Sequence, residues 1–313
     1  SVEPTHFFRY GINRRPEKLS TLISIEENAV SAKETFLNQL SMSTTISLDK
    51  IINIDLLKNV STSFDFERME KLTLPSLENN SNAILHNNIS YFPIGAKGTK
   101  GMPMPKWSIT VSKLAEKIRF IEDYFQTFTL SHVFQGNREQ SYTNNIKEDE
   151  TFLISYSPLL KVKAKTHGRS PIIFDTQYDF KQKIINKNST QRDHNHTITS
   201  SIKFNKKGGL KIPLFFLRDF YIDNDMDYAI NFSYIIEKKL EVSDVDVDTI
   251  IDDITFNEKE KDITWSIRNS IGYRFNQWVT GNIYFDYSVS EKLRTPKTVV
   301  TDFGFNMKIR ITG

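Results

Sequence analysis

The chain has 313 residues, of which 41 are basic and 38 are acidic, so its formal net charge is only +3. This near balance argues against a dedicated nucleic-acid binder, which gathers positive charge on one surface. The absence of cysteine excludes a disulfide-held scaffold and any cysteine-ligated metal site. The longest apolar runs, such as residues 212–217, are far shorter than the ~18 residues of a membrane helix. The protein is therefore either soluble or crosses a membrane with strands.

Aromatic residues make up 12% of the chain, with 23 Phe, 12 Tyr and 3 Trp. Outer-membrane barrels share this richness because aromatic girdles mark both membrane interfaces, although large β-sandwiches are also rich in aromatic residues. The sequence begins Ser-Val-Glu-Pro, without an initiator Met or a signal segment. We therefore expect this start to be processed, truncated or internal to a longer chain.

The N-terminal part of the sequence predicts strands of modest regularity and one short helix. Strands are expected near residues 5–12, 36–49, 57–69, 106–113 and 126–139. The stretch 113–125 has apolar residues at helical spacing and predicts a short helix that plugs or lines a rim. Its apolar residues are Leu114, Ile118, Ile121, Tyr124 and Phe125.

From residue 152 onward, apolar and polar residues alternate, as they do in strands with one apolar and one polar face. The alternating runs are residues 152–165, 172–180, 197–204, 226–236, 263–275, 279–289 and 303–312. With the earlier segments they make about twelve strands, most of them roughly 8–14 residues long. A tilted membrane strand needs ~9–11 residues and a typical globular strand ~5–6. The lengths therefore favour a membrane barrel over a sandwich.

The alternation also assigns side chains to two surfaces. In a membrane barrel the apolar side contacts lipid and the polar side lines a wet lumen. The predicted lipid-facing residues are Trp265, Ile283, Phe285, Phe303, Phe305 and Ile309. The predicted lumen-facing residues are Arg268, Arg274, Asp286, Lys308 and Arg310.

The connections between these strands fall into short and long classes. Residues 276–277 and the stretch 167–170 are short, whereas 71–104, 140–150, 183–193 and 240–261 are long, polar and often charged. Outer-membrane barrels have short periplasmic turns and longer external loops, so we expect these four loops on the outside. The stretch 206–224, which contains Gly208 and Gly209, fits either a strand or an ordered rim.

The other candidate motifs do not indicate a metal-binding or catalytic site. His194 and His196 share one strand face and could bind a metal together with Asp193, but a solvated strand start beside an outer loop is the favoured interpretation. The acidic run at positions 244, 246 and 248 lacks the later Gly and Glu of a calcium loop. No nucleophile elbow or metalloprotease signature is present. We therefore expect no catalytic site, no metal and no cofactor.

The stretch 91–114 contains a distinctive Gly-x-Pro-x-Pro-x-Trp-x-Ile-Thr run, which includes Pro103, Pro105 and Trp107 and is followed by Leu114. Later strands read Gly-Tyr-Arg-Phe, Tyr-Phe-Asp-Tyr and Phe-Gly-Phe-Asn-Met-Lys-Ile. Together these segments resemble the C-terminal part of the SprA family, the outer-membrane translocons of the type 9 secretion system, which is linked to gliding motility. The resemblance covers about residues 85–313, and residues 1–84 are assigned by strand pattern alone.

The resemblance implies that residues 1–313 form one segment, about twelve strands, of a far larger antiparallel, up-and-down transmembrane β-barrel. It implies a passive channel in the bacterial outer membrane, without enzymatic activity. The implied partners are outer-membrane lipid, secreted substrate proteins and plug or gating subunits, with no nucleic acid among them. Two other classes stay open: a surface or secreted β-sandwich that binds a partner, and an outer-membrane barrel of another kind, either a transporter or an enzyme.

Overall fold

The computed structural model describes residues 6–16, 34–47, 59–74, 84–94, 100–144, 146–187, 189–206, 210–214, 217–222, 225–243, 257–275 and 278–310. Nearly all of these residues belong to antiparallel strands, and helix is confined to two short pieces. The predicted all-β antiparallel class is therefore confirmed. Within these ranges no helix is both long enough and apolar enough to cross a lipid bilayer.

The first half of the chain contains seven strands and both helical pieces. In chain order these are β1 (His6–Pro16), β2 (Glu34–Ser47), β3 (Val60–Leu74), β4 (Ile84–Pro93), β5 (Gly101–Pro103), β6 (Lys106–Val111), the 3-10 helix η5 (Leu114–Glu116), α1 (Arg119–Tyr124) and β7 (Phe125–Thr143). The second half is entirely β in its described elements. They are β8 (Ile146–Thr166), β9 (Ile172–Asn186), β10 (Ser189–Lys206), β11 (Leu210–Leu214), β12 (Leu217–Ile222), β13 (Met226–Ser243), β14 (Asn257–Arg274), β15 (Val279–Lys292) and β16 (Thr298–Ile309).

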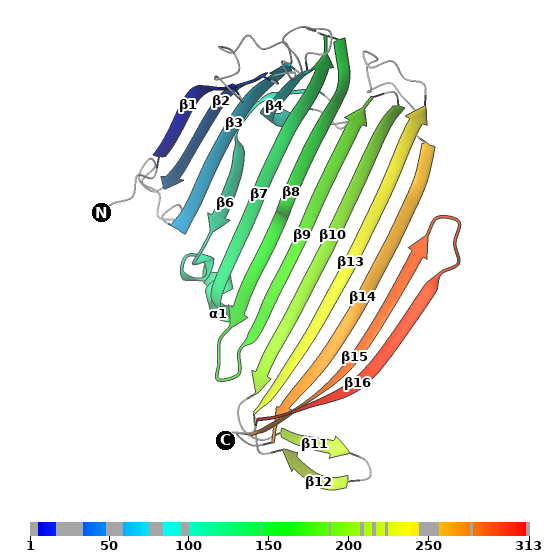
Figure 1. Ribbon diagram of the computed structural model, residues 1–313. Coiled ribbons are helices and arrows are strands. Elements are labelled where there is room, and N and C mark those ends of the chain that lie inside the picture. The colour runs from blue at the N-terminus through cyan, green and yellow to red at the C-terminus, as the bar shows by residue number, and fades with distance from the viewer. Residues whose placement is uncertain are drawn as a thin grey trace.

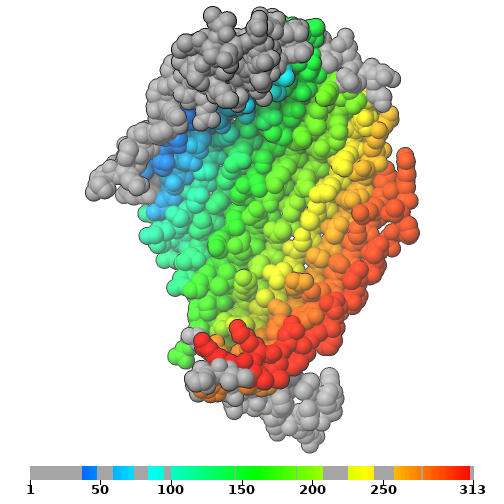
Figure 2. Space-filling model, in the orientation of Figure 1, coloured from blue at the N-terminus to red at the C-terminus, as the bar shows by residue number. Residues whose placement is uncertain are grey.

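The strands form one 14-stranded sheet and a separate two-stranded hairpin, β11–β12. The main path follows chain order as β1-β2-β3-β4-β7-β8-β9-β10-β13-β14-β15-β16, an up-and-down meander that Figure 1 shows as a single twisted layer. Figure 2 shows the same strands as one continuous surface. Among the described residues no second sheet packs face to face on this layer. The path ends at β1 and β16, which do not pair with each other in that part of the chain.

One position in this sheet is occupied by two strands. β3 pairs with β4 through residues 68–73 and with β6 through residues 60–65, and β7 pairs with the same two strands on the other side. β4 and β6 are therefore two halves of one interrupted strand. The chain leaves the sheet after β4, forms β5 against the end of β4, and re-enters as β6. The prediction of one continuous loop over 71–104 is wrong, because β4 and β5 lie inside it.

Two other predicted loops are also wrong. The stretches 140–150 and 183–193 belong to long hairpins, β7–β8 and β9–β10, in which strand pairing continues almost to the turn. The β7–β8 turn begins with Asn144 at φ 53°, a left-handed conformation that asparagine tolerates in tight hairpins. Both stretches are polar, and polar composition predicts a loop. Polar residues also occupy strands that extend beyond an apolar zone, so composition alone does not separate the two cases.

The predicted loop 240–261 is wrong at both ends, because β13 runs to Ser243 and β14 begins at Asn257, and residues 244–256 lie outside the described residues. Several other predicted elements agree with the structure. The stretch 113–125 is helical as predicted, through η5 and α1. A short turn connects β8 to β9, and Gly168 in it has φ +109°, which favours glycine. The predicted connection at residues 276–277 lies outside the described residues. The stretch 206–224 contains the hairpin β11–β12, at the same end of the sheet as the C-terminus (Figure 1).

Candidate functional site

One face of the sheet is predominantly apolar over β13–β16, and we call it the apolar face. Register aligns Tyr228, Ile271, Ile283 and Phe305 in one row across these four strands. Similar rows fill residues 226–236, 263–273, 279–289 and 299–309, which we call the apolar belt, with Asn269, Gly281 and Thr301 as its exceptions. Its side chains are most exposed on β15 and β16, where Ile283 is 45% exposed and Phe305 55%. Those on β13 are half-buried, and Val289 is buried.

The six residues predicted to face lipid all lie on this apolar face. Phe303 is opposite Phe285, Phe305 is opposite Ile283, and Ile309 is opposite Val279. Trp265 is half-buried and packs against Tyr287, with ring centroids 5.3 Å apart.

The opposite face, which we call the polar face, presents hydroxyl, amide and charged side chains. Arg268 on β14 lies opposite Asp286 on β15 and donates from Nε to both carboxylate oxygens at 2.8 Å. Arg274 and Lys308 flank Thr280 on the two neighbouring strands. These four predicted lumen-facing residues therefore share one face. The fifth, Arg310, follows the end of β16, where its backbone N–H donates to the Trp278 carbonyl at 2.8 Å.

Small hydroxyl side chains meet in pairs across the strands of the polar face. Ser63 and Ser108 have their Oγ atoms 2.7 Å apart, and Thr264 Oγ1 donates to Ser290 Oγ at 3.4 Å. Each pair satisfies part of its hydrogen-bonding capacity within the sheet. The resulting surface is hydrophilic but offers few strong anchoring groups at these positions.

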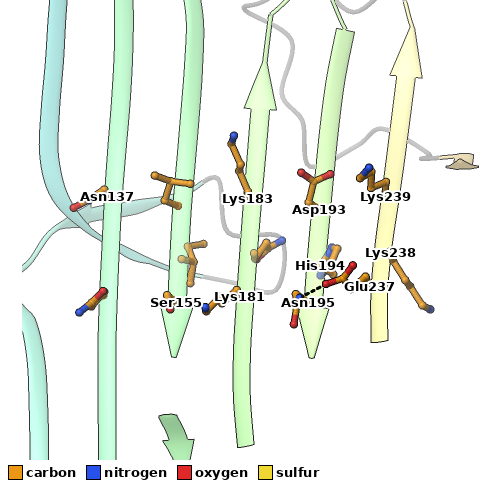
Figure 3. A pocket seen from close by; sticks show the side chains of 14 residues that line it. Asn137, Ser155, Lys181, Lys183, Asp193, His194, Asn195, Glu237, Lys238 and Lys239 are labelled. Carbon is orange, nitrogen blue, oxygen red and sulfur yellow. Dashed lines mark hydrogen bonds between the residues drawn. The ribbon is translucent and has the colours of Figure 1, made fainter. Parts of the chain in front are cut away.

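Shallow hollows occupy the polar face. Figure 3 shows one of about 470 Å³ over β7–β13, where Asn195 donates to Glu237 at 2.7 Å. A second, of about 910 Å³, lies over β8–β14, and in it Asp175 accepts ion pairs from Lys161 at 3.4 Å and Lys163 at 3.8 Å. Cations outnumber carboxylates in both linings. In the second hollow, Lys161, Lys163, Lys203 and Arg268 surround the carboxylate of Asp175, so the field there is positive.

The distinctive Pro-Pro-Trp run coincides with the interruption between β4 and β6. Pro103 lies opposite Tyr91 in the small β4–β5 pairing, and Pro105 stands just before β6. Trp107 on β6 stacks on Phe134 of β7 with ring centroids 4.2 Å apart, and Phe92 contacts the same phenylalanine ring at 5.2 Å. The proline-rich excursion therefore folds over the apolar face. Leu114, the last residue of the motif, is buried in η5.

Sequence reasoning missed the glycine that permits this excursion. A Cβ placed on Gly136 of β7 would lie 2.0 Å from the Tyr91 carbonyl oxygen and 2.8 Å from the Phe134 ring. Real Cβ atoms do not approach other atoms so closely, so the chain can cross β7 at this point only over a glycine. Gly136 has no neighbouring sequence signal, and only the pairing of distant strands identifies its role.

Sequence reasoning also missed an aromatic row on the apolar face. Register aligns one ring from each of five strands, β6 to β10: Trp107, Phe134, Tyr156, Phe180 and His196. Adjacent centroids lie 4.2 to 6.2 Å apart. On β9 and β10 the next positions beyond this row are Gln182 and His194, whereas Phe152, Ile154 and Ile184 beyond it are apolar and buried. Polar side chains therefore enter this face on β9 and β10 while β8 stays apolar.

The candidate metal ligands are not brought together. His194 and His196 lie on the apolar face, and His196 Nδ1 is 2.9 Å from the Tyr178 hydroxyl. Asp193 lines the polar-face hollow of Figure 3 instead, because successive strand residues point to opposite faces. Within the described residues no cluster of His, Asp and Glu could hold a metal ion. The acidic run at 244–248 lies outside the described residues.

Comparisons with known proteins add no relative. No protein-family model matches the chain, and no curated protein matches it significantly.

Proposed function

We propose that the chain forms part of the wall of a protein-conducting channel in the bacterial outer membrane, of the type 9 secretion class that residues 85–313 resemble. The supporting observation is a single-layered sheet with an exposed apolar face and a hydrophilic opposite face. A soluble sheet of this size covers its apolar face with another layer. Here Phe303 remains 69% exposed and Met307 57% exposed.

The dimensions of the apolar belt support a bilayer as the missing cover. Each of its four segments spans 11 residues. At a rise of ~3.3 Å per residue and a tilt of ~45°, such a segment gives a band about 24 Å tall. Lipid-facing bands of outer-membrane barrels are ~25 Å tall. The strands themselves are longer, up to 21 residues in β8, so they extend beyond the bilayer.

The two edge strands of the sheet require further strands to complete the channel. β1 and β16 each present an unpaired row of backbone groups in the described sheet. Hydrocarbon does not tolerate unpaired backbone groups, so both edges must pair with further strands in the membrane. The chain then contributes one arc of a larger closed barrel.

The polar face lines the lumen in this proposal, and its action is passive. Charged groups that are partly held in ion pairs, together with internally paired hydroxyl groups, keep the wall hydrated while limiting adhesion of a passing polypeptide. Secreted proteins move through the lumen, and separate plug or gating subunits control access. No residue performs covalent chemistry, and no cofactor is required.

Site-specific photocrosslinking in secreting cells tests this function. A photoreactive amino acid at Ser233, on the polar face, should capture secreted proteins, whereas the same probe at neighbouring Phe232 should capture lipid. The full-length protein is used, so the barrel is complete. Capture of a protein layer at Phe232, with no secreted protein at Ser233, would contradict the proposal and favour a sandwich-type binding module. Capture of small solutes alone at Ser233 would favour another kind of barrel transporter.

A further inference from the structure

A row of three basic side chains crosses the apolar face one step beyond the apolar belt. Register places His194 of β10 opposite Lys238 of β13, and Lys238 opposite Lys261 of β14. The next row on this face, towards the belt, includes Ile236 opposite Ile263. The basic row therefore stands where side chains change from apolar to polar.

The two lysines of this row are directly opposed across neighbouring strands, an arrangement that destabilises a sheet. Neither Lys238 nor Lys261 forms an ion pair with another residue in the described ranges. Such a row is stabilised when an anion binds between the ammonium groups.

Among the described residues, the carboxylates near the row either have other partners or form no ion pair with it. Glu237 and Asp262 lie on the polar face, where each has its own partner. Glu258 and Glu291 line a rim hollow together with Lys261, but neither forms an ion pair with it. Within the described residues, the ammonium groups of Lys238 and Lys261 therefore have no ion-pair partner.

A hollow of about 470 Å³ opens on the apolar face beside the row. Its polar end is lined by His194 and Lys238, and its other end by Tyr178, Ile198 and Tyr234. Burial, followed by the positive charges of Arg192, His196 and Lys238, lowers the pKa of His194 to about 4. His194, which lies beyond the apolar belt, is therefore neutral at neutral pH, and its ring N–H can donate a hydrogen bond to an anion.

We propose that Lys238, Lys261 and His194 bind the phosphate group of an anionic membrane lipid, whose acyl chain lies in the hollow over Ile198 and Tyr234. The amphipathic layout fits this ligand because phosphate oxygens accept from the ammonium groups while the chain covers apolar side chains. The site rests on the proposed function, since the apolar face must contact a bilayer. It deepens that function by assigning the lipid class and its place on the barrel wall.

Lipid retention by the purified full-length protein tests the site. Wild type, the double variant Lys238→Gln/Lys261→Gln and the control Lys239→Gln are placed in phosphatidylcholine nanodiscs that contain some diphosphoryl lipid A. Lys239 is the control because it lies on the polar face and pairs with Glu260 at 2.6 Å. After detergent extraction, lipid A per protein is measured by mass spectrometry. We expect the double variant to retain about 30-fold less than wild type and Lys239→Gln to match wild type.

The outcomes separate the site from the channel proposal. If all three proteins enter the nanodiscs and retain equal amounts of lipid A, the proposed lipid site is wrong and the proposed membrane location is unaffected. If inorganic phosphate displaces lipid A from the wild type, the row binds free anions and the lipid assignment is wrong. If the wild type does not enter the bilayer, the membrane proposal fails and the lipid site fails with it.

Discussion

Two regions of the sheet reverse the usual relation between polarity and burial. In the apolar belt of β13–β16, large apolar side chains such as Phe303 and Phe305 are exposed. At the far ends of β7–β10, polar side chains are buried: Glu150 is 6% exposed, Arg192 8% and Thr190 0%. Both regions share one continuous antiparallel lattice, so backbone pairing does not explain the difference.

The difference indicates that the environment of the sheet is apolar around the belt and polar around the far ends of β7–β10. Buried polar groups persist where partners satisfy them, and Glu150 accepts from Arg138 at 2.6 Å and from Gln140 at 2.9 Å. Exposed apolar rows persist where the surroundings are themselves apolar. We therefore interpret the belt as the bilayer-spanning part and the ends of β7–β10 as a part that stands beyond it.

The largest effect is expected from a charge in the apolar belt. Phe305→Arg should cost ~2–4 kcal/mol of membrane stability, because it places a guanidinium in hydrocarbon. The amount of folded protein in outer-membrane fractions should fall at least about tenfold. The matched control, Asn306→Arg on the polar face, should assemble normally. Equal losses for the two variants would contradict the assigned faces.

A smaller but clear effect is expected at the crossing over β7. Gly136→Ala should destabilise the protein by ~1–3 kcal/mol, because the added methyl group overlaps the Tyr91 carbonyl. Urea unfolding in detergent micelles measures the change. Gly272→Ala is the control, since its Cβ would have only an ordinary contact at 3.6 Å with Asp227, and it should stay within ~0.5 kcal/mol of wild type. An unchanged free energy of unfolding for Gly136→Ala would mean that the β4–β5 segment does not cross β7 at this residue.

The buried polar end should respond more strongly than an exposed ion pair. Glu150→Gln removes the carboxylate that pairs with Arg138 at 2.5 Å and Lys147 at 3.6 Å, and should cost ~1–3 kcal/mol. Glu260→Gln removes an exposed partner of Lys239 and should cost no more than ~1 kcal/mol. The same urea titration compares the two variants. A larger loss of unfolding free energy for Glu260→Gln than for Glu150→Gln would contradict the assignment of a buried, partner-dependent polar end.

The smallest effect is expected on the polar wall. Lys308→Ser leaves a small polar side chain opposite Thr280 and should change stability by less than ~0.5 kcal/mol. Membrane assembly and secretion by the variant should match wild type. A severe loss of assembly would show that Lys308 stands in a closely packed environment.

The sequence predicted best those features that depend on neighbouring residues. Alternation placed Phe305 and Asn306 on opposite faces, and helical spacing located η5 and α1 within residues 113–125. It failed where the answer depends on distant strands. The polar ends of β7–β10 were taken for loops, and β4 was missed because its interrupted strand is completed by β6.

The same limit applies to the candidate site. The roles of Gly136, the aromatic row and the basic row arise from register between strands that lie far apart in the sequence. Alternation places the neighbours Lys238 and Lys239 on opposite faces, but only the register shows that Lys238 lies opposite Lys261. Periodicity in the sequence therefore assigns residues to faces. Only the strand pairing in the structure shows which residues of neighbouring strands contact each other on a face.

The central claim is that the apolar belt touches lipid, and a cysteine scan along β16 in native membranes tests it most directly. Residues 1–313 contain no cysteine, so each variant from residue 299 to 309 introduces a single thiol into this part of the wall. A membrane-impermeant maleimide should label thiols at even positions, such as 304 and 306, and spare odd positions, such as 303 and 305. A lipid-soluble maleimide should show the reverse. Equal labelling of both sets by the impermeant reagent would contradict the account.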